Sequence, residues 1–323
     1  MNMIDAHSLP AGEQTVSVYA LSTGHLQLPD RWLFEDASED LLHDRQYSPD
    51  FSFLIKHPRG KVVFDLGLRK DLENNPQAIK DEYALISIEI PNDVKEILDA
   101  GPEHSSSVTA VVLSHLHFDH TGDCMKFPDA ELIVGPGSSA ATAPGWPEAK
   151  GSPFDGAVLK HPHFRELSFE KDNWQRVGPF HRCIDYFGDQ SFYIIDAPGH
   201  MDGHLGGLAR TGVDEWVFMG GDCCHHRSLL TGTRPMSVTV GPSKTPSFHR
   251  YPDVAKSTIE KIRTLERQGI VLIALAHDAR LDGVMPEYPQ AINGWKGSSW
   301  KKALDQELTR DYPKYYQTNG MAE

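Results

Sequence analysis

Residues 111 to 123 read VVLSHLHFDHTGD. A run of apolar residues ends in three histidines and an aspartate, which are His115, His117, Asp119 and His120. In an extended segment alternate side chains share one face, so the first two histidines point the same way at the end of a strand. A turn into a helix would bring the aspartate and the third histidine beside them. The stretch therefore predicts a strand that leads into a metal site.

The residue types in this loop indicate which metal and how many ions to expect. Imidazole nitrogen and carboxylate oxygen suit a borderline divalent ion such as zinc. A mononuclear catalytic site usually takes three protein ligands and leaves one position open. Four ligand-type residues in one loop therefore indicate two adjacent ions, with zinc as the expected element. A solvated histidine-rich turn is the alternative, but the apolar strand before it argues against that interpretation.

Composition limits the possible functions of the chain. It has 323 residues, of which 39% are hydrophobic, and this is enough for a packed core. The 31 basic and 45 acidic residues give a formal net charge of -14, which would repel a nucleic-acid backbone. The sequence shows no export signal and no apolar run that could span a membrane. We therefore expect a soluble, cytoplasmic protein without a nucleic-acid or membrane partner.

Strand and helix patterns alternate along the chain. Strand patterns are predicted at 15–21, 130–134, 191–197, 215–219 and 270–276, besides the strand of the motif. A hairpin pattern covers 51–66, with His-Pro-Arg-Gly at its turn. Helix patterns with start or stop signals cover 91–101, 254–268 and 300–308.

The domain organisation follows from the same patterns. Residues 1–14 show no periodicity and are expected to be a loose terminus. We predict one domain over 15–323, with an irregular insertion at about 138–180 and a tail from about 286. The insertion is rich in Gly, Pro and scattered aromatic residues, and long irregular stretches inside a domain are usually functional. We interpret it as a pocket wall or lid, with surface decoration as the alternative.

Three later strand patterns also end in ligand-type residues. His200 follows Pro198-Gly199, Asp222 follows two glycines, and His277 ends a continuous apolar strand. A single histidine at the end of a strand is often structural. Three further strands that each end in a ligand-type residue instead indicate a site at one end of a sheet sandwich.

The motif at 115–120 resembles the HxHxDH signature of the metallo-β-lactamase superfamily, and the later residues follow in that family's order. The resemblance implies an α/β fold, the αβ/βα sandwich, in which two mixed β-sheets lie face to face with helices on the outer faces. It also implies two metal sites that share a bridging aspartate. The implied ligands are His115, His117 and His200 for one metal, Asp119, His120 and His277 for the other, and Asp222 as the bridge.

The resemblance also implies a reaction. Two metals that share a water activate it for attack on an electrophilic centre, so we expect hydrolysis. Asp119 is the expected proton carrier to the leaving group. The arrangement most resembles N-acyl homoserine lactonases, but these carry a tyrosine three residues after the bridging aspartate, where this chain has His225. An imidazole can donate the same hydrogen bond to a carbonyl oxygen, and a merely supporting or surface histidine is the alternative.

Substrate class stays open between related reactions. The run Cys223-Cys224-His225-His226 is similar to fungal members that include lactamases opening benzoxazolinone-type rings. Aromatic residues at 32–34 and 146–174 predict a flat, apolar pocket for a small uncharged ring. We expect ring opening of a lactone, with a lactam or cyclic carbamate as the next choice. A glyoxalase II-like thioesterase, a mononuclear-iron sulfur oxygenase and a non-catalytic metal-binding protein are further alternatives.

Asp65 and the four cysteines are the remaining residues with an expected role or state. Asp65 closes the second strand of the hairpin and could support a ligand histidine from outside the metal sites, or could simply be a polar residue at a strand end. The four cysteines, Cys124, Cys183, Cys223 and Cys224, are too few and too irregular for a disulfide framework. They are predicted to be reduced, buried thiols.

Overall fold

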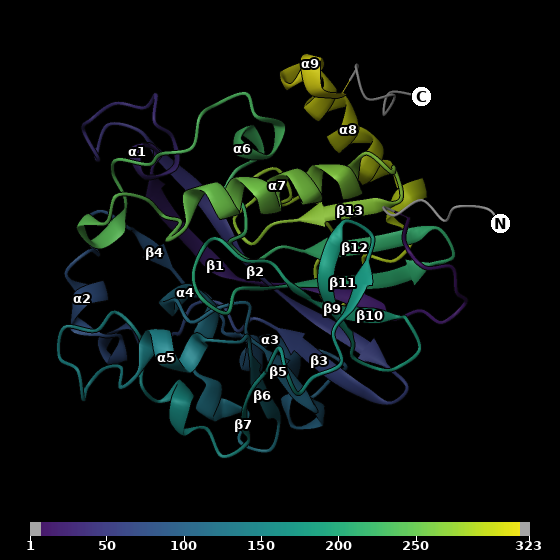
Figure 1. The fold of residues 1–323 in the computed structure, drawn as a ribbon, viewed down its shortest axis with the longest axis horizontal. Helices are drawn as coiled ribbons and strands as arrows, with labels where there is room; N and C mark the ends of the chain where they lie inside the picture. Colours follow the sequence, from purple (N-terminus) through teal and green to yellow (C-terminus); the bar gives the residue numbers. More distant parts are fainter. Residues whose placement is uncertain (1–7, 317–323) are drawn as a thin grey trace.

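A seven-stranded mixed sheet forms one layer of the molecule (Figure 1). The structure is a computed structural model, and it describes residues 8–316. In spatial order the sheet contains β4 (Ile88–Glu89), β1 (Ser17–Pro29), β2 (Arg45–His57), β3 (Gly60–Phe64), β5 (Ala110–Val112), β6 (Glu131–Val134) and β7 (Phe164–Glu166). Strands β1 to β3 pair antiparallel, whereas β3, β5, β6 and β7 run parallel. The predicted hairpin is therefore confirmed as β2 and β3.

A six-stranded sheet forms the second layer. In spatial order it contains β13 (Val271–Ala274), β12 (Glu215–Met219), β11 (Leu205–Gly212), β10 (Phe192–Asp196), β9 (Phe180–Asp185) and β8 (Gln175–Val177). Strands β12 and β13 are parallel, and the other neighbours are antiparallel. The predicted sandwich of two mixed sheets is confirmed.

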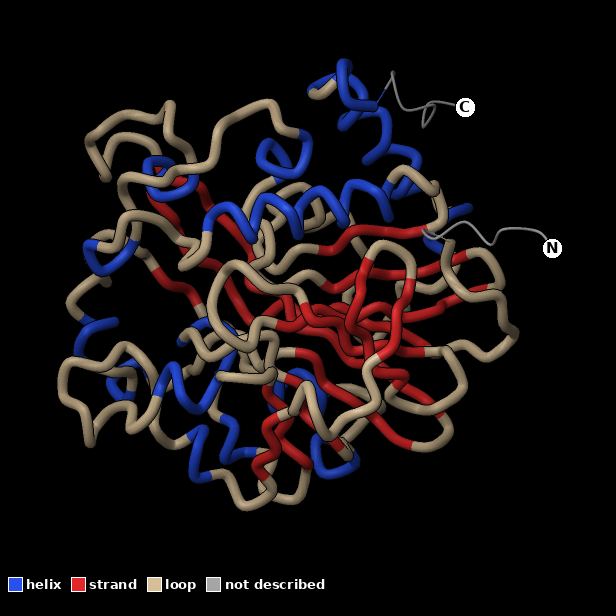
Figure 2. The backbone as a smooth tube through the Cα atoms, viewed as in Figure 1, coloured by secondary structure: helices blue, strands red, loops and turns tan. Residues whose placement is uncertain are grey.

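Helices lie around the central strands (Figure 2). The described helices are α1 (Asp30–Leu33), α2 (Gln77–Lys80), α3 (Val94–Ala100), α4 (Phe118–Thr121), α5 (Ser138–Thr142), α6 (Arg227–Thr231), α7 (Pro252–Glu266), α8 (Ser299–Asp311) and α9 (Pro313–Tyr316). Short 3-10 turns occur at Leu72–Asn74, Ser105–Ser107, Cys124–Lys126, Val158–Lys160, Pro242–Lys244 and Trp295–Gly297. Helices α3, α7 and α8 confirm the three helix predictions, and α4 begins immediately after His117, where the motif was expected to turn.

Helix α3 shows how the local sequence sets a boundary. The Asp93 carboxylate accepts from the Glu96 backbone N–H at 2.9 Å, and the Glu96 carboxylate accepts from the Asp93 N–H at 3.2 Å. This reciprocal pair is a capping box, which satisfies backbone donors that an open helix end leaves unpaired. Gly101 follows the last residue of the helix, as the stop signal predicted.

Alternation along the strands divides the apolar side chains between separate cores. Val62 and Phe64 of β3 pack between the two sheets. Val63 points to the opposite face, where it packs with Val94 and Leu98 of α3. Helix α7 covers the outer face of the other sheet in the same way. Because successive strand residues face opposite sides, each sheet has one face in the interior and one under helices.

Strand β11 is absent from the sequence-based prediction. Its sequence, LGGLARTG, is rich in glycine, which disfavours strands in isolation. At Gly207 an added Cβ would lie 2.9 Å from Met219 Cε of the neighbouring strand. Pairing with β10 and β12 on its two sides, rather than local propensity, makes this segment a strand.

The segment 138–180 is less irregular than the sequence predicts. It contains α5, β7 and β8, and β7 extends the first sheet while β8 extends the second. These strands have three residues each, too few to show a periodicity. The extent of a single domain over 15–323 stays a prediction.

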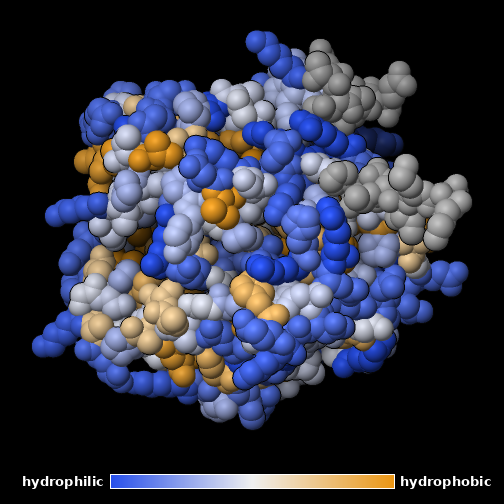
Figure 3. All heavy atoms as spheres, viewed as in Figure 1, coloured by the Kyte–Doolittle hydropathy of each residue, from blue (hydrophilic) through white to orange (hydrophobic). Residues whose placement is uncertain are grey.

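Part of the expected loose terminus, residues 1–7, lies outside the described residues. Beyond it, the carbonyl oxygens of Pro10 and Gly12 accept from the Arg210 guanidinium at 2.7 and 3.2 Å. Among the described helices, none is long and apolar enough to cross a membrane. The face shown in Figure 3 is largely hydrophilic, with small separate hydrophobic groups.

Candidate metal centre and active site

The seven predicted ligands lie just beyond strand ends. Strands β10, β12 and β13 run in one direction within their sheet, so their carboxyl ends meet at one edge. His200, Asp222 and His277 follow these three ends. The 115–120 motif follows strand β5 of the other sheet, and it lies beside these three residues. The structure brings all seven side chains together in two groups.

The first group contains three histidines. His115 Nε2 lies 2.9 Å from His117 Nδ1 and 3.1 Å from His200 Nε2. The third side of this triangle, from His200 Nε2 to His117 Nδ1, is 2.9 Å. Single N–H donors cannot satisfy three nitrogens around one centre, whereas a metal ion binds all three at once.

The second group contains Asp119, His120 and His277. His277 Nε2 lies 3.7 Å from Asp119 Oδ2, and His120 Nε2 lies 4.0 Å from Asp119 Oδ1. This mixed set of imidazole nitrogens and carboxylate oxygen suits zinc and related divalent ions.

Asp222 lies between the two groups and presents one oxygen to each. Its Oδ1 is 3.1 Å from His120 Nε2 and 3.2 Å from His277 Nε2. Its Oδ2 is 3.5 Å from His200 Nε2 and 3.6 Å from His115 Nε2. With one oxygen toward each group, Asp222 is placed where it could bridge two ions, and its role as the bridge stays a prediction.

The electrostatics of the second group fit a bound cation. Burial lowers the pKa of His120, but the carboxylates of Asp222 and Asp65 outweigh it and hold that pKa well above its ordinary value. The carboxylates thus favour positive charge at this point. His120 Nε2, His277 Nε2 and Asp222 Oδ1 are buried and close together, but none of them has a hydrogen-bond partner of suitable geometry within the described part of the chain. Buried polar atoms are rarely left unpaired, and a divalent ion would satisfy these three.

A pocket of about 420 Å³ borders both groups. Four candidate ligands line it: His117, Asp119, His200 and Asp222. The rest of its lining is largely apolar and includes Leu28, Trp32, Ile79, Ile86, Phe118, Phe154, Met201 and Phe248. A pocket of this size and character accommodates a small organic molecule.

The predicted aromatic wall is only partly correct. Trp32 and Phe154 line the pocket, but the other aromatic residues of 146–174 are not among its lining residues. Phe34 is buried elsewhere. Instead, the loop at 242–250 supplies much of the lining. This loop is rich in Pro, Ser and Thr, and no sequence pattern indicates which pocket it borders.

A family comparison matches residues 48–213 to the metallo-beta-lactamase superfamily. The matched region is more than half of the chain and includes the 115–120 motif and His200. This chain belongs to the metallo-β-lactamase superfamily. The two-sheet sandwich is therefore the fold of a metallo-β-lactamase superfamily member.

Curated relatives within the superfamily cover nearly the whole chain. Metallo-hydrolase mfmC of Annulohypoxylon moriforme is 36% identical over 337 residues, which is 92% of this chain and 87% of that protein. Gamma-lactamase FDB1 of Fusarium pseudograminearum (strain CS3096) is 31% identical over 345 residues, which is 91% of this chain and 82% of that protein. The names of these two relatives are those of a metallo-hydrolase and a lactamase.

One relative is much longer than this chain. Cytochrome P450 monooxygenase mpaDE' of Penicillium brevicompactum is 36% identical over 325 residues. The match covers 92% of this chain but 37% of that protein. The chain thus spans little more than a third of the length of this relative.

Solved structures share the fold. A quorum-quenching N-acyl homoserine lactone hydrolase superimposes with a TM-score of 0.63 at 17% identity, covering 86% of this chain and 99% of that chain. AidC, a dizinc quorum-quenching lactonase, superimposes with a TM-score of 0.53 at 14% identity, covering 87% and 92%. At these identities the likeness shows the metallo-β-lactamase fold alone.

Asp65 supports the second ligand group of the superfamily site. Its Oδ2 lies 2.9 Å from His120 Nδ1, and its Oδ1 accepts the Ser114 backbone N–H at 2.6 Å. Its backbone has φ of 62°, a left-handed conformation that is uncommon for residues other than glycine. Of the two interpretations of Asp65, the structure shows the supporting contact.

Asp65→Asn is expected to weaken metal binding by about 10- to 100-fold, the usual effect of losing an outer-shell partner of a ligand histidine. Asparagine tolerates the left-handed backbone and can still accept the Ser114 N–H, so the thermal midpoint of the metal-free protein should change little. Competition with a chelator, followed by elemental analysis, measures the effect. Metal affinity equal to that of the wild type would contradict it.

His204 is a site residue that the sequence analysis missed. Its Nδ1 donates to the Ala197 carbonyl at 3.0 Å, and its Nε2 accepts the Asp222 N–H at 3.1 Å. Burial lowers the pKa of His204 to about 3, so the ring is neutral. The contact holds the backbone of the aspartate that both groups share. The spacing of four residues after His200 is the sequence signal that could have found it.

His225 lies beside Asp222 but is not among the residues that line the pocket. Its Nε2 is 3.2 Å from Asp222 Oδ2, and its ring centroid is 4.5 Å from that of Phe248. Its Nδ1 has no hydrogen-bond partner among residues 8–316. The predicted contact between His225 and a substrate carbonyl stays a prediction.

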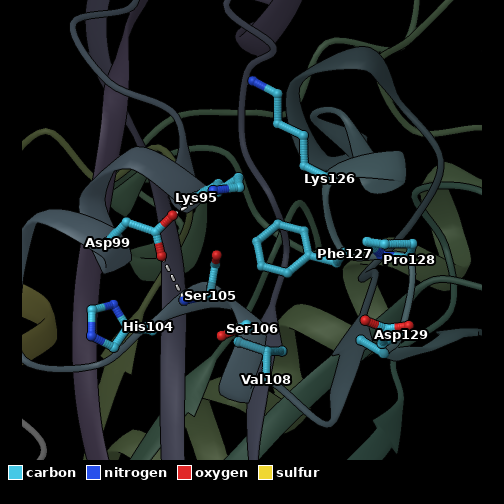
Figure 4. Close-up of a pocket in the computed structure, with 11 residues that line it drawn as sticks. Lys95, Asp99, His104, Ser105, Ser106, Val108, Lys126, Phe127, Pro128 and Asp129 are labelled. Atoms are coloured by element: carbon cyan, nitrogen blue, oxygen red, sulfur yellow. Dashed lines mark hydrogen bonds and ion pairs between the residues drawn. The ribbon is translucent and has the colours of Figure 1, made fainter.

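A separate hollow of about 580 Å³ shares no lining residue with the metal site (Figure 4). Three of its charged side chains, those of Lys95, Asp99 and Lys126, pair with near neighbours. Lys95 contacts Asp99, which also accepts the Ser105 N–H at 2.8 Å, and Lys126 contacts Asp93. Because these charges are already paired, the hollow shows no cluster prepared for a ligand.

Proposed function

We propose that this chain is a hydrolase that uses two divalent ions, expected to be zinc, to open small uncharged cyclic acyl compounds by hydrolysis. One observation carries the proposal: the Asp222 carboxylate presents an oxygen to each ligand group and borders an apolar pocket of about 420 Å³. The proposed ligands are His115, His117 and His200 for the first ion, Asp119, His120 and His277 for the second, and Asp222 for both.

The buried, unpaired donor atoms of the second group support two ions rather than one. AidC, which shares the fold, is a dizinc lactonase, and this supports zinc. When bound, two such ions supply an activated water and stabilise the oxygen that gains charge during attack. Asp119 lines the pocket, so its carboxylate is placed to accept a proton from the nucleophile and to pass it to the leaving group.

The pocket and the relatives together support a small ring as the substrate. The lining is mostly apolar, which disfavours a charged peptide or nucleotide. The resemblance of the sequence to the lactonases favours a lactone. The gamma-lactamase relative covers most of the chain, whereas the lactonase structures share only the fold. We therefore propose a cyclic amide or carbamate and a lactone as equally good candidates for the substrate class.

The test compares kcat/KM on one metal-loaded preparation. The panel contains homoserine lactones, aromatic γ-lactones and benzoxazolinone-like lactams, with lactoylglutathione and a phosphodiester as the competing classes. We expect a cyclic compound to be the best substrate and elemental analysis to find about two ions per chain. A preference for the thioester or phosphodiester would overturn the proposal, and one iron per chain would indicate the oxygenase class.

His225→Ala is expected to lower kcat by roughly ten- to a thousand-fold, the range for losing a donor to a developing oxyanion. Its unpaired Nδ1 is the atom available for that contact, since Nε2 lies against Asp222. Metal content should equal that of the wild type. A loss of metal in the variant would make His225 a ligand or a support of Asp222, and would contradict the assignment.

The proposed cytoplasmic location is supported by the state of the thiols. Cys124, Cys183, Cys223 and Cys224 are all buried and free of disulfides. Burial raises the pKa of Cys224 to about 12, which keeps it protonated and unreactive. Such thiols fit a reducing compartment.

A further inference from the structure

One histidine in the pocket lining has no role in the proposed chemistry. His249 is buried, and neither of its ring nitrogens has a hydrogen-bond partner among the residues that the structure describes. It lies on the 242–250 loop and lines the pocket beside the candidate ligands. Buried polar groups are nearly always paired, so the two free nitrogens of His249 require an explanation.

His249 lies next to two other histidines of the site. Its ring centroid is 5.3 Å from that of His200 and 5.0 Å from that of His225. One ring nitrogen from each of the three residues lies within 4.8 Å of the others. His200 Nδ1 and His225 Nδ1 are also unpaired within the described chain. Three imidazole rings, each with at least one unpaired nitrogen, therefore lie together beside the pocket.

Three other polar side chains of this loop are already engaged. Ser247 donates to a backbone carbonyl at 2.7 Å, and Thr245 donates to another at the same distance. Arg250 pairs with Asp202 at 2.6 Å. His249 therefore differs from these neighbours in having hydrogen-bonding capacity left for a molecule in the pocket.

We propose that His249 is a substrate-binding residue that hydrogen-bonds the polar edge of the ring, formed by the carbonyl group and the ring heteroatom. A neutral imidazole offers one donor and one acceptor. Both suit an uncharged cyclic amide, carbamate or ester. The apolar neighbours Trp32 and Phe248 would contact the rest of the ring. This inference rests on the proposed ring-opening function.

His249→Ala and His249→Gln test the proposal against the control Tyr251→Phe. Tyr251 lies two residues further on the chain, is partly exposed, and is not among the pocket-lining residues. The assays measure kcat and KM on the ring compound that the wild type opens fastest, together with metal content and the thermal midpoint. We expect the alanine variant to raise KM by about three- to tenfold, the effect of losing one neutral hydrogen bond, with a smaller change in kcat.

The glutamine variant should recover part of the KM effect, because its amide also donates and accepts. Metal content should stay equal to that of the wild type, and Tyr251→Phe should leave KM unchanged. If the wild type opens the ring and the KM of His249→Ala equals that of the wild type, the inference is overturned while the proposed function stands. If the alanine variant loses a metal ion, His249 is a ligand and the inference is also overturned. A wild type that opens no member of the panel overturns the proposed function and this inference together.

Discussion

Asp222→Asn is expected to lower kcat/KM by roughly two orders of magnitude or more, because it alters a ligand that both proposed ions share. Asparagine keeps the size of the side chain but replaces one charged oxygen with an NH₂ group. Whichever way the amide turns, that group faces either the nitrogens of His120 and His277 or those of His200 and His115. One group would thereby lose its bridging oxygen.

Elemental analysis and kinetics on the same preparation check this result. Metal content should fall below that of the wild type, whereas the fold should persist because His204 contacts the backbone of residue 222 rather than its side chain. Asp214→Asn, in the turn between β11 and β12, is the matched control and should leave both readouts unchanged. Activity of Asp222→Asn within a few-fold of wild type would remove Asp222 from the site.

Glu266→Gln is expected to lower the free energy of unfolding by about 3–5 kcal/mol, the usual cost of removing one partner of a buried ion pair. Glu266 Oε1 lies 2.6 Å from Nη1 of the buried Arg227. Its carboxylate also accepts from the hydroxyls of Tyr315 and Tyr316 of α9, at 2.9 and 3.2 Å. The neutral amide would leave the guanidinium charge with the carboxylate of Asp278, at 3.5 Å, as its ion-pair partner.

Urea unfolding of the wild type, Glu266→Gln, Arg227→Met, Glu266→Met and the double methionine variant measures this effect. In Arg227→Met/Glu266→Met both charges are replaced by apolar side chains, so the double variant should lose less stability than the sum of the two single variants. Arg234→Met, which removes a partly exposed arginine that pairs with Asp30 and Asp36, is the control and should cost about 1 kcal/mol or less. A loss below that value in Glu266→Gln would show that the pair contributes little.

The local parts of the fold were predictable because each is encoded within a short segment. The hairpin at 51–66 has alternating apolar residues and a turn sequence. Helix α3 has its capping residues at Asp93 and Glu96, and its glycine stop. The ligand types at 115–120 follow directly from the motif. In each case the signal and the structure occupy the same few residues.

The pocket and the histidines beside it, His204 and His249, were not predictable in this way. His204 and His249 stand in segments without a strand or helix pattern, and their importance comes from contact with Asp222 and His200. Aromatic residues of 146–174 were expected in the pocket because they are aromatic, but only Phe154 lines it. Composition identifies apolar side chains without showing which surface they face.

The sequence by itself determined the motif strand, because periodicity and ligand chemistry are local properties. The sandwich class and the seven candidate ligands followed from the resemblance of the motif and the later residues to the metallo-β-lactamase superfamily. Only the tertiary structure decided that the ends of β10, β12 and β13 meet the motif of β5, and that glycine-rich β11 lies between its neighbours as a strand. It also decided that the 242–250 loop borders the pocket. These features depend on pairing and packing between distant segments, which no short stretch of sequence encodes.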